Sequence, residues 1–442
     1  MSRHHAPTRA AQLAALFAAP LIHDIAARLE LQRRGRHPIA LHLAWGALAR
    51  LYRSANRLDA ELAHPGAWAE LVARYNAGAA AHPDGRVVPD HVPRLTADTY
   101  RHFRDYLCDH PDRLALLGEV FTEQSVALAR ALGLLDPDGP GSLTRPHPSR
   151  TIYGDGTVVR PIYSNSPTGT RVDPDAEAHR RHDGTVIGNN FLTIAVRGPQ
   201  RHQRVILAVG RAPRPGGEAA AAIELVRRVH AYAGAGIQAL VYDGALRGTH
   251  HHTLMSELGI LVINKVHPAS TSGDRRAWKP HTLGTWTHPV GRRGSCTHTL
   301  VAHNGAVHDA TIDDHGRLTL SDPLPRKQVR RYPARRRHGW RFSLGVTVPC
   351  PYGTWTAWIS PHPAPGDPTH GRPDQLRLLP EHDRHFAPLY GLRNDSEAIN
   401  AAYKHTLIAG RAPARGWPRQ LLDLTSWAVL TNSLAWSTRT TS

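Results

Sequence analysis

Four polar residues near the carboxyl end of the chain have types and spacing that could serve phosphodiester chemistry. They are Tyr390, Arg393, Glu397 and Lys404, within YGLRNDSEAINAAYKHTL. At about 100° per residue of an α-helix, all four fall within an arc of roughly 60°. On such a stripe a carboxylate could hold a metal ion while its cationic neighbours contact phosphates. The simpler alternative is a solvated helix face on which Arg393 and Glu397 form a weak ion pair.

The opposite face of the same helix is predicted to be buried. It carries Leu392, Ile399, Ala402 and Tyr403. Apolar residues at this spacing are typical of a helix that packs its inner side on a core. These residues are therefore expected to supply the buried face of the helix, opposite the charged stripe.

Two aspartates could complete a metal site with Glu397. Asp155 stands in the strand-like segment IYGDGTVV, and Asp243 closes the apolar segment ALVYD. Both precede glycine, so a hairpin turn at Asp155 and a turn or helix cap at Asp243 are alternatives. Three converging carboxylates repel one another unless a cation joins them, and hard oxygen ligands suit Mg²⁺. Two such ions about 3.5–4 Å apart would activate an attacking oxygen and stabilise a leaving one.

The elements that must position these acids follow a recognisable order. Residues 9–135 show helical periodicity, and a Pro- and Gly-rich linker at 136–148 ends it. Strands are then predicted at 150–163, 188–198 and 203–211, a helix at 216–236, a strand at 237–243, a helix at 249–258 and a strand at 259–266. This order predicts an α/β fold with one mixed sheet flanked by helices, as in ribonuclease H-like folds. In such a sheet Asp155 and Asp243 would be neighbours, and a helix packed across it could present Glu397.

The long passage before the last helices has a different composition. Between Val266 and Pro380 the chain is rich in Gly, Thr, Trp and Pro with short strand-like pieces, which predicts an inserted β-rich domain. The predicted organisation has four parts: an all-helical N-terminal domain at 1–148 for DNA-end binding or dimerisation, a first part of the catalytic core at 149–266, the insertion at 267–380, and C-terminal core helices at 381–442. A helix-turn-helix could lie between Ala40 and Leu62.

The spacing Tyr390-x2-Arg393-x3-Glu397-x6-Lys404 resembles, in all four residues and all three gaps, the YREK signature of bacterial insertion-sequence DDE transposases. Asp155 and Asp243 look like the first two acids of that family, and the resemblance covers roughly residues 150–410. It implies cleavage of DNA ends and strand transfer by a homodimer. It also implies two Mg²⁺ ions, for which Mn²⁺ can substitute, and as partners the terminal inverted repeats of the element and a target DNA.

One departure from the family follows the second acid. The family often places Arg and an aromatic residue there, whereas this chain has Gly-Ala-Leu-Arg247. The contacts around Asp243 are therefore not carried over, although the acid itself is.

The charge of the chain favours a polyanionic partner. The formal net charge is +18, and neutralising phosphates releases condensed counterions, although a GC-rich genome would also enrich Arg. A cluster of basic and aromatic residues is expected to contact DNA: Arg330, Arg331, Arg335, Arg336, Arg337 and Trp340. A solvated loop is the alternative. Whether Trp278, Trp286 or Trp340 stacks on a flipped base cannot be decided from a motif.

The cysteines and histidines suggest no zinc site. The three cysteines, Cys108, Cys296 and Cys350, form no CxxC pair, which predicts neither a disulfide framework nor a four-thiolate centre. Neither His250–His252 nor the set Cys296, His298 and His303 has zinc-ligand spacing. The histidine tract is instead expected to open the helix beside Asp243, close to phosphate.

The expected location is the cytoplasm, with association to the nucleoid when the protein is bound to DNA. Residues 10–22 could pass for a short signal sequence, but the apolar pattern continues amphipathically beyond them. No segment approaches the roughly 20 apolar residues of a membrane span, so no membrane partner is expected.

The leading hypothesis is thus a DDE transposase that cuts and joins DNA. One alternative is a catalytically inactive or domesticated transposase-derived protein that only binds DNA. Another is a ribonuclease H-like nuclease that acts without strand transfer.

Overall fold

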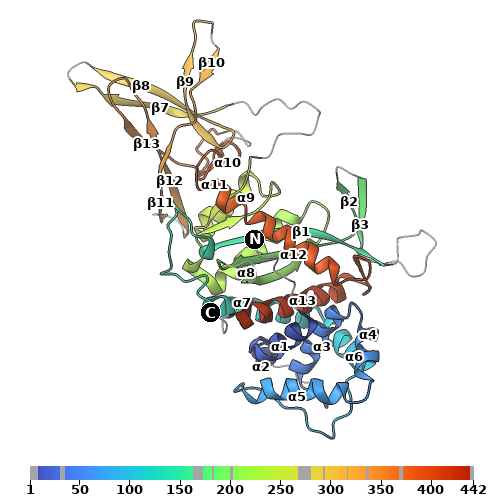
Figure 1. Ribbon diagram of the computed structural model, residues 1–442. Helices are drawn as coiled ribbons and strands as arrows, with labels where there is room; N and C mark the ends of the chain where they lie inside the picture. Colours follow the sequence, from blue (N-terminus) through green and yellow to red (C-terminus); the bar gives the residue numbers. More distant parts are fainter. Residues whose placement is uncertain are drawn as a thin grey trace. The chain divides into compact units, whose positions relative to one another are not determined.

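The computed structural model describes residues 8–29, 35–162, 173–181, 184–199, 203–266, 280–291, 294–315, 317–334, 338–367 and 372–438. The chain forms two compact units. The first unit comprises Met1–Asp136, Gly154–Gly234 and Ser396–Ser442, and the second comprises Pro137–Tyr153 and Ala235–Asp395. Strand β1 (Thr151–Pro161) and helix α12 (Arg393–His405) each begin in the second unit and continue into the first. Figure 1 labels the elements along the chain.

The amino-terminal part of the first unit is helical, as expected from its periodicity. Its helices are α1 Arg9–Ala18, α2 Leu21–Leu29, α3 Ile39–Leu51, α4 Ala55–Leu62, α5 Ala67–Ala80, α6 Ala97–Cys108 and α7 Pro111–Ala131. Every residue of α3 from Ala40 to Arg50 is buried, because this helix is apolar on all sides. Its one charged residue, Arg50, pairs at 3.2 Å with the buried Asp423. Helix α3 therefore offers no exposed face for reading DNA.

The strands of the first unit are covered by helices on which apolar residues recur. The strands are β1 from Gly154 onward, β2 Glu177–Arg181, β3 Gly184–Arg197, β4 Arg204–Arg211 and β14 Arg411–Ala412. Strand β3 pairs antiparallel with β2 and with β4, and β1 pairs parallel with β14. Helices α7 and α8 (Glu218–Ala233), and also α13 (Trp417–Ser437), contact β4.

One buried amide ties α13 to the outer edge of β4. Asn432 is fully buried, accepts a hydrogen bond from the backbone N–H of Ile206 at 2.8 Å and donates one to its carbonyl at 2.9 Å. The same amide nitrogen also donates to Ser125 of α7 at 3.1 Å. A side chain thus meets backbone groups of β4 that would otherwise be buried without partners.

The second unit begins with a parallel set of strands. The first residues of β1 pair with β5 (Ala239–Val241), and β5 pairs with β6 (Leu261–Ile263). Between β5 and β6 lies α9 (Gly248–Thr253), which continues as a π-helical turn, Leu254–Leu258. The strand order through β1 is β2-β3-β1-β5-β6, which is a mixed sheet.

Two further antiparallel sheets complete the second unit. The four-stranded sheet has the order β10-β9-β8-β7, and the three-stranded sheet β11-β12-β13. Their strands are β7 His281–Pro289, β8 Ser295–His303, β9 Ala306–Ile312, β10 Leu318–Leu320, β11 Arg326–Pro333, β12 Trp340–Val348 and β13 Trp355–Ile359. The short helices α10 (Arg372–Gln375) and α11 (Phe386–Tyr390) precede α12.

The mixed α/β character predicted from the sequence is confirmed, as is the parallel pairing of the first strand with the strand after the first crossover helix. Strand β2 was not predicted. Leu392, just before α12, and Ile399 and Tyr403 on α12 are buried as expected, but Ala402 is exposed. Among the described residues, no single helix is long and apolar enough to cross a membrane, and only α1 and α2 counted together, bent by 47°, reach that length and composition.

Candidate metal centre

Asp155 lies inside β1, four residues from its start. The strand continues to Pro161, so the alternative of an Asp-Gly hairpin turn at this position is wrong. Asp155 is partly exposed, while Thr151, Ile152 and Tyr153 before it are buried. A buried segment therefore anchors a carboxylate that emerges near the middle of the strand.

Within the first unit, Asp155 has a second carboxylate as a neighbour. One oxygen of Asp155 lies within 4.8 Å of one oxygen of Glu218, the first residue of α8. Glu218 accepts a hydrogen bond from Asn190 of β3 at 2.9 Å. A Cβ atom at Gly156 would lie 2.5 Å from Glu218 Oε2, so glycine at this position makes room for the acid. Two partly exposed carboxylates at this separation could bind one divalent cation from both sides.

Glu218 was not among the residues predicted from the sequence. An acid in the first turn of a helix is common, because it complements the helix dipole. The sequence could have indicated Glu218 through the position of α8, because this helix follows the predicted β3 and β4 strands and begins at Glu218.

Helix α12 reaches Asp155 through an amide. Asn400 Nδ2 donates to Asp155 Oδ2 at 2.9 Å, and Asn400 is 8% exposed. On the helix wheel Asn400 stands beside the stripe of Arg393, Glu397 and Lys404, at about 20–60° from each of them. Glu397 is exposed one turn before Asn400, and Lys404 is partly exposed one turn after it. Glu397 and Lys404 therefore lie one turn before and after the residue that contacts Asp155. The predicted stripe on a single helix is wrong at its start, because Tyr390 is the last residue of α11 and α12 begins at Arg393.

The second unit holds Asp243 and the first residues of the stripe. Asp243 follows β5 by two residues and accepts a hydrogen bond from the backbone N–H of Ala245 at 2.8 Å. The turn expected as an alternative role for Asp243 is thus present, and it fixes the orientation of the carboxylate. Asn264, just after β6, donates to the Asp243 carbonyl at 3.3 Å and to that of Leu246 at 2.9 Å.

Tyr390 lies in a charged environment within the second unit. Burial raises the pKa of its phenol, Asp243 and Glu381 raise it further, and Arg393 and Lys265 act in the opposite direction. Lys265 Nζ lies 5.7 Å from the centre of the Tyr390 ring and pairs with Glu381 at 3.0 Å. Asp243 and Arg393 therefore both lie close enough to Tyr390 for their charges to influence its phenol.

The predicted basic cluster is only partly available to DNA. Arg330 is exposed on β11, with its guanidinium carbon 3.8 Å from the centre of the Trp358 ring. Arg331 is partly buried, donates to the Gly259 carbonyl at 2.7 Å and lies 4.5 Å from the centre of the Trp340 ring. Arg335, Arg336 and Arg337 lie outside the described residues, as does Trp278. Of the two described arginines of the cluster, Arg330 is thus the more exposed and the better placed for phosphate.

The three consecutive histidines have three different environments. His250 Nδ1 is the partner of the Arg247 backbone N–H at 3.3 Å, at the start of α9. His251 is buried and bonds to the Leu246 carbonyl at 3.2 Å, and burial lowers its pKa. His252 Nδ1 lies 3.2 Å from Nδ1 of His362. Of the three, only His250 fits the expected place at the opening of the helix that follows Asp243.

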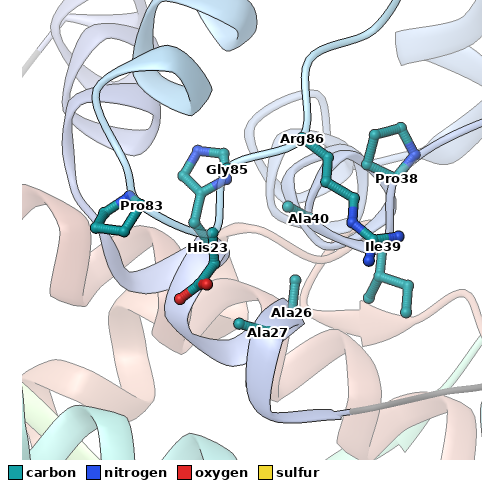
Figure 2. A pocket seen from close by; sticks show the side chains of 10 residues that line it. His23, Ala26, Ala27, Pro38, Ile39, Ala40, Pro83, Gly85 and Arg86 are labelled. Atoms are coloured by element: carbon teal, nitrogen blue, oxygen red, sulfur yellow. The ribbon is translucent and has the colours of Figure 1, made fainter.

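A pocket in the first unit lies among the amino-terminal helices. Figure 2 shows His23, Ala26, Pro38 and Arg86 among the residues that line it. The lining combines apolar residues with the polar side chains of His23, Asp84 and Arg86, and none of the predicted catalytic residues takes part.

Comparison with known proteins adds no family to this geometry. No protein-family model matches the chain, and no curated protein matches it.

Proposed function

We propose that this protein is a DDE transposase with a ribonuclease H-like core, which cleaves DNA ends and transfers the strands with the help of Mg²⁺. Asp155, Asp243 and Glu397 are the catalytic acids in this proposal. Glu218 is a further carboxylate beside Asp155. Terminal inverted repeats and target DNA are the substrates, and a homodimer is the acting species.

The hydrogen bond from Asn400 to Asp155 carries the proposal. It joins α12, which bears Arg393, Glu397 and Lys404 of the YREK spacing, to the strand that bears the first acid, although 245 residues separate the two partners. The side next to Glu397 is the one that meets Asp155.

The register of the parallel strands supports Asp243 as the second acid. Tyr153 on β1 pairs with Val241 on β5, and each acid follows its paired residue by two positions. Adjacent parallel strands place equal offsets side by side, and open α/β sheets bind ligands at the ends of their strands. Asp243 is therefore expected beside Asp155.

The donor set fits a hard cation. The carboxylates of Asp155, Asp243, Glu218 and Glu397 would repel one another without a counter-charge, and Mg²⁺ prefers such oxygen ligands together with substrate phosphate. When bound, a pair of these ions would activate the attacking water or 3′-hydroxyl and stabilise the leaving oxygen. Around this centre, Lys404 and Arg393 would contact phosphates and Tyr390 would bond or stack along the strand.

The test is cleavage of element-end DNA with Mg²⁺ by single-site variants. Asp155→Asn, Asp243→Asn and Glu397→Gln are each expected to abolish nicking and to leave end binding within about threefold of the wild type, because the DNA is held mainly by cations. Glu218→Gln tests the additional acid. Its matched control is Glu224→Gln on the same helix, whose side chain is 69% exposed and pairs with Arg227. The control is expected to nick normally.

Each outcome has a distinct meaning. Full nicking by Asp155→Asn or Asp243→Asn would overturn the proposed centre. Full nicking by Glu397→Gln together with loss in Glu218→Gln would make Glu218 the third acid. Tight end binding without nicking by the wild-type protein would instead establish a DNA-binding protein that has lost catalysis.

A further inference from the structure

Four metal-binding side chains meet in the second unit, away from the sequence positions of the catalytic acids. They are His288 on β7, Cys296 and His298 on β8, and Cys350 just after β12. One ligand atom from each lies within 4.8 Å of all the others. Cys296 Sγ is 3.3 Å from His298 Nε2 and 3.4 Å from Cys350 Sγ. In a tetrahedral zinc site, Zn–S bonds of about 2.3 Å and Zn–N bonds of about 2.0–2.1 Å separate the ligand atoms by roughly 3.3–3.8 Å.

Strand pairing explains how these ligands come together. His288 and Cys296 are direct cross-strand partners on β7 and β8. Cys296 and His298 are two residues apart on one strand, so their side chains point to the same face. Three ligands are thus fixed on one side of a single hairpin.

The fourth ligand comes from the other antiparallel sheet. Cys350 opens a turn between β12 and β13, closed by a 2.9 Å hydrogen bond from the Gly353 N–H to the Cys350 carbonyl. Gly353 has φ +121°, a conformation that favours glycine. The Cys350 sulfur also accepts a hydrogen bond from the backbone N–H of Tyr352. This turn holds the sulfur toward the hairpin.

A carboxylate orients one of the imidazoles. His298 Nδ1 lies 2.5 Å from Asp309 Oδ2 on β9, and His298 is 8% exposed. Because the carboxylate accepts, Nδ1 carries the proton and the lone pair of Nε2 points to the two sulfurs. Metal-bound histidines commonly have this carboxylate partner. The ring of Trp355 lies 5.2 Å from that of His288 and 5.9 Å from that of His298, and it shields the cluster on that side.

We propose that His288, Cys296, His298 and Cys350 bind one Zn²⁺ ion in tetrahedral geometry. Four protein ligands leave no open position, so the ion has a structural role. It links the β7–β8 hairpin of the four-stranded sheet to the β12–β13 turn of the three-stranded sheet. Both sheets are small, and β7, β10 and β11 expose many side chains, so little apolar burial is available to hold the sheets. Zinc binding would therefore be coupled to the folding of this part of the chain.

The first test measures zinc and thiols in the purified wild-type protein kept under reducing conditions. We expect one zinc per chain by elemental analysis. After denaturation with a chelator we expect three reactive thiols, because Cys108 is the remaining cysteine. One reactive thiol and no zinc would mean a Cys296–Cys350 disulfide and would overturn the proposal. Three thiols with neither zinc nor uptake of added Zn²⁺ would also overturn it.

Cobalt provides a spectroscopic test that needs no variant. After chelation and addition of Co²⁺, the wild-type protein should show intense visible bands of tetrahedral coordination and thiolate charge-transfer absorption. The weak spectrum of six-coordinate Co²⁺ would contradict the proposed ligands.

Variants then identify the ligands. Cys350→Ser and His288→Gln should lose the thiolate–cobalt spectrum in part or change its shape, and should retain less than one zinc per chain. Two matched controls should retain the full stoichiometry: Cys108→Ser, in the first unit, and His303→Gln, at the end of the same strand as His298. Asp309→Asn should keep the stoichiometry but weaken zinc affinity by about 10- to 100-fold. If Cys350→Ser retained as much zinc as the wild type, Cys350 would not be a ligand and the proposed four-ligand site would be wrong.

Discussion

Deleting the Asn400 amide tests how α12 serves the first acid. Asn400 Nδ2 donates to Asp155 Oδ2 at 2.9 Å from a site that is 8% exposed. A hydrogen bond to a charged group contributes about 1.5–3 kcal/mol to the stability of the arrangement that it holds. If that energy orients Asp155 for catalysis, Asn400→Ala should slow single-turnover cleavage by about 10- to 150-fold, since each 1.36 kcal/mol is about tenfold in rate.

The assay is nicking of end DNA at saturating Mg²⁺, with end affinity measured in parallel. Affinity should stay within about threefold, because Asn400 is a positioning residue and carries no charge. Asn394→Ala, an exposed position on the same helix, is the control and should cleave normally. Asn400→Asp places a further carboxylate beside Asp155, in addition to Glu218, and should shift the pH of half-maximal cleavage upward. Cleavage by Asn400→Ala within twofold of the wild type, with normal DNA affinity, would refute the positioning role.

Two further predictions concern charge and pH. Lys404→Ala should reduce the salt dependence of end binding by about one phosphate contact, seen as a smaller slope of log affinity against log salt, and an unchanged slope would remove Lys404 from the DNA interface. Burial, and then the neighbouring His82, lowers the pKa of His23 to about 4 from 6.5. The unfolded chain therefore binds this proton first as pH falls, and the free energy of unfolding should drop by up to about 3 kcal/mol between pH 6.5 and 4. Urea unfolding of wild type and His23→Phe at several pH values checks this, and parallel pH profiles for the two proteins would contradict it.

The order of elements could be read from the sequence because local pattern determines it. Alternating or continuous apolar runs mark β1, β3, β4, β5 and β6, and the period of 3.6 residues marks α8. Strand β2 was not predicted because its five residues, EAHRR, are mostly charged and show no clear alternation of apolar and polar side chains. The residues of β2 form a strand because they pair with β3, and not because of their own composition.

The two sites were harder to predict from the sequence, because tertiary pairing brings together residues that carry no local sequence signal. Asn400 is an uncharged amide on a helix, and nothing in its sequence context indicates that it meets Asp155. Glu218 has the ordinary position of an acid that stabilises a helix start. The cysteine and histidine cluster is the clearest case: Cys350 is 54 residues from Cys296, and no short spacing motif connects them. Only the register of two strands and one turn makes them neighbours.

The two hydrogen bonds between Asn432 and Ile206 also bear on whether the edge of β4 can pair with a strand of another molecule. Among the described strands, β4 pairs with β3, and its other side is an edge that could accept a strand from another molecule. The Asn432 amide occupies both the donor and the acceptor of Ile206 on that side, as a neighbouring strand would. Helix α13 therefore blocks the addition of a strand at Ile206, and a chain that lost Asn432 would offer this donor and acceptor to a strand of another molecule.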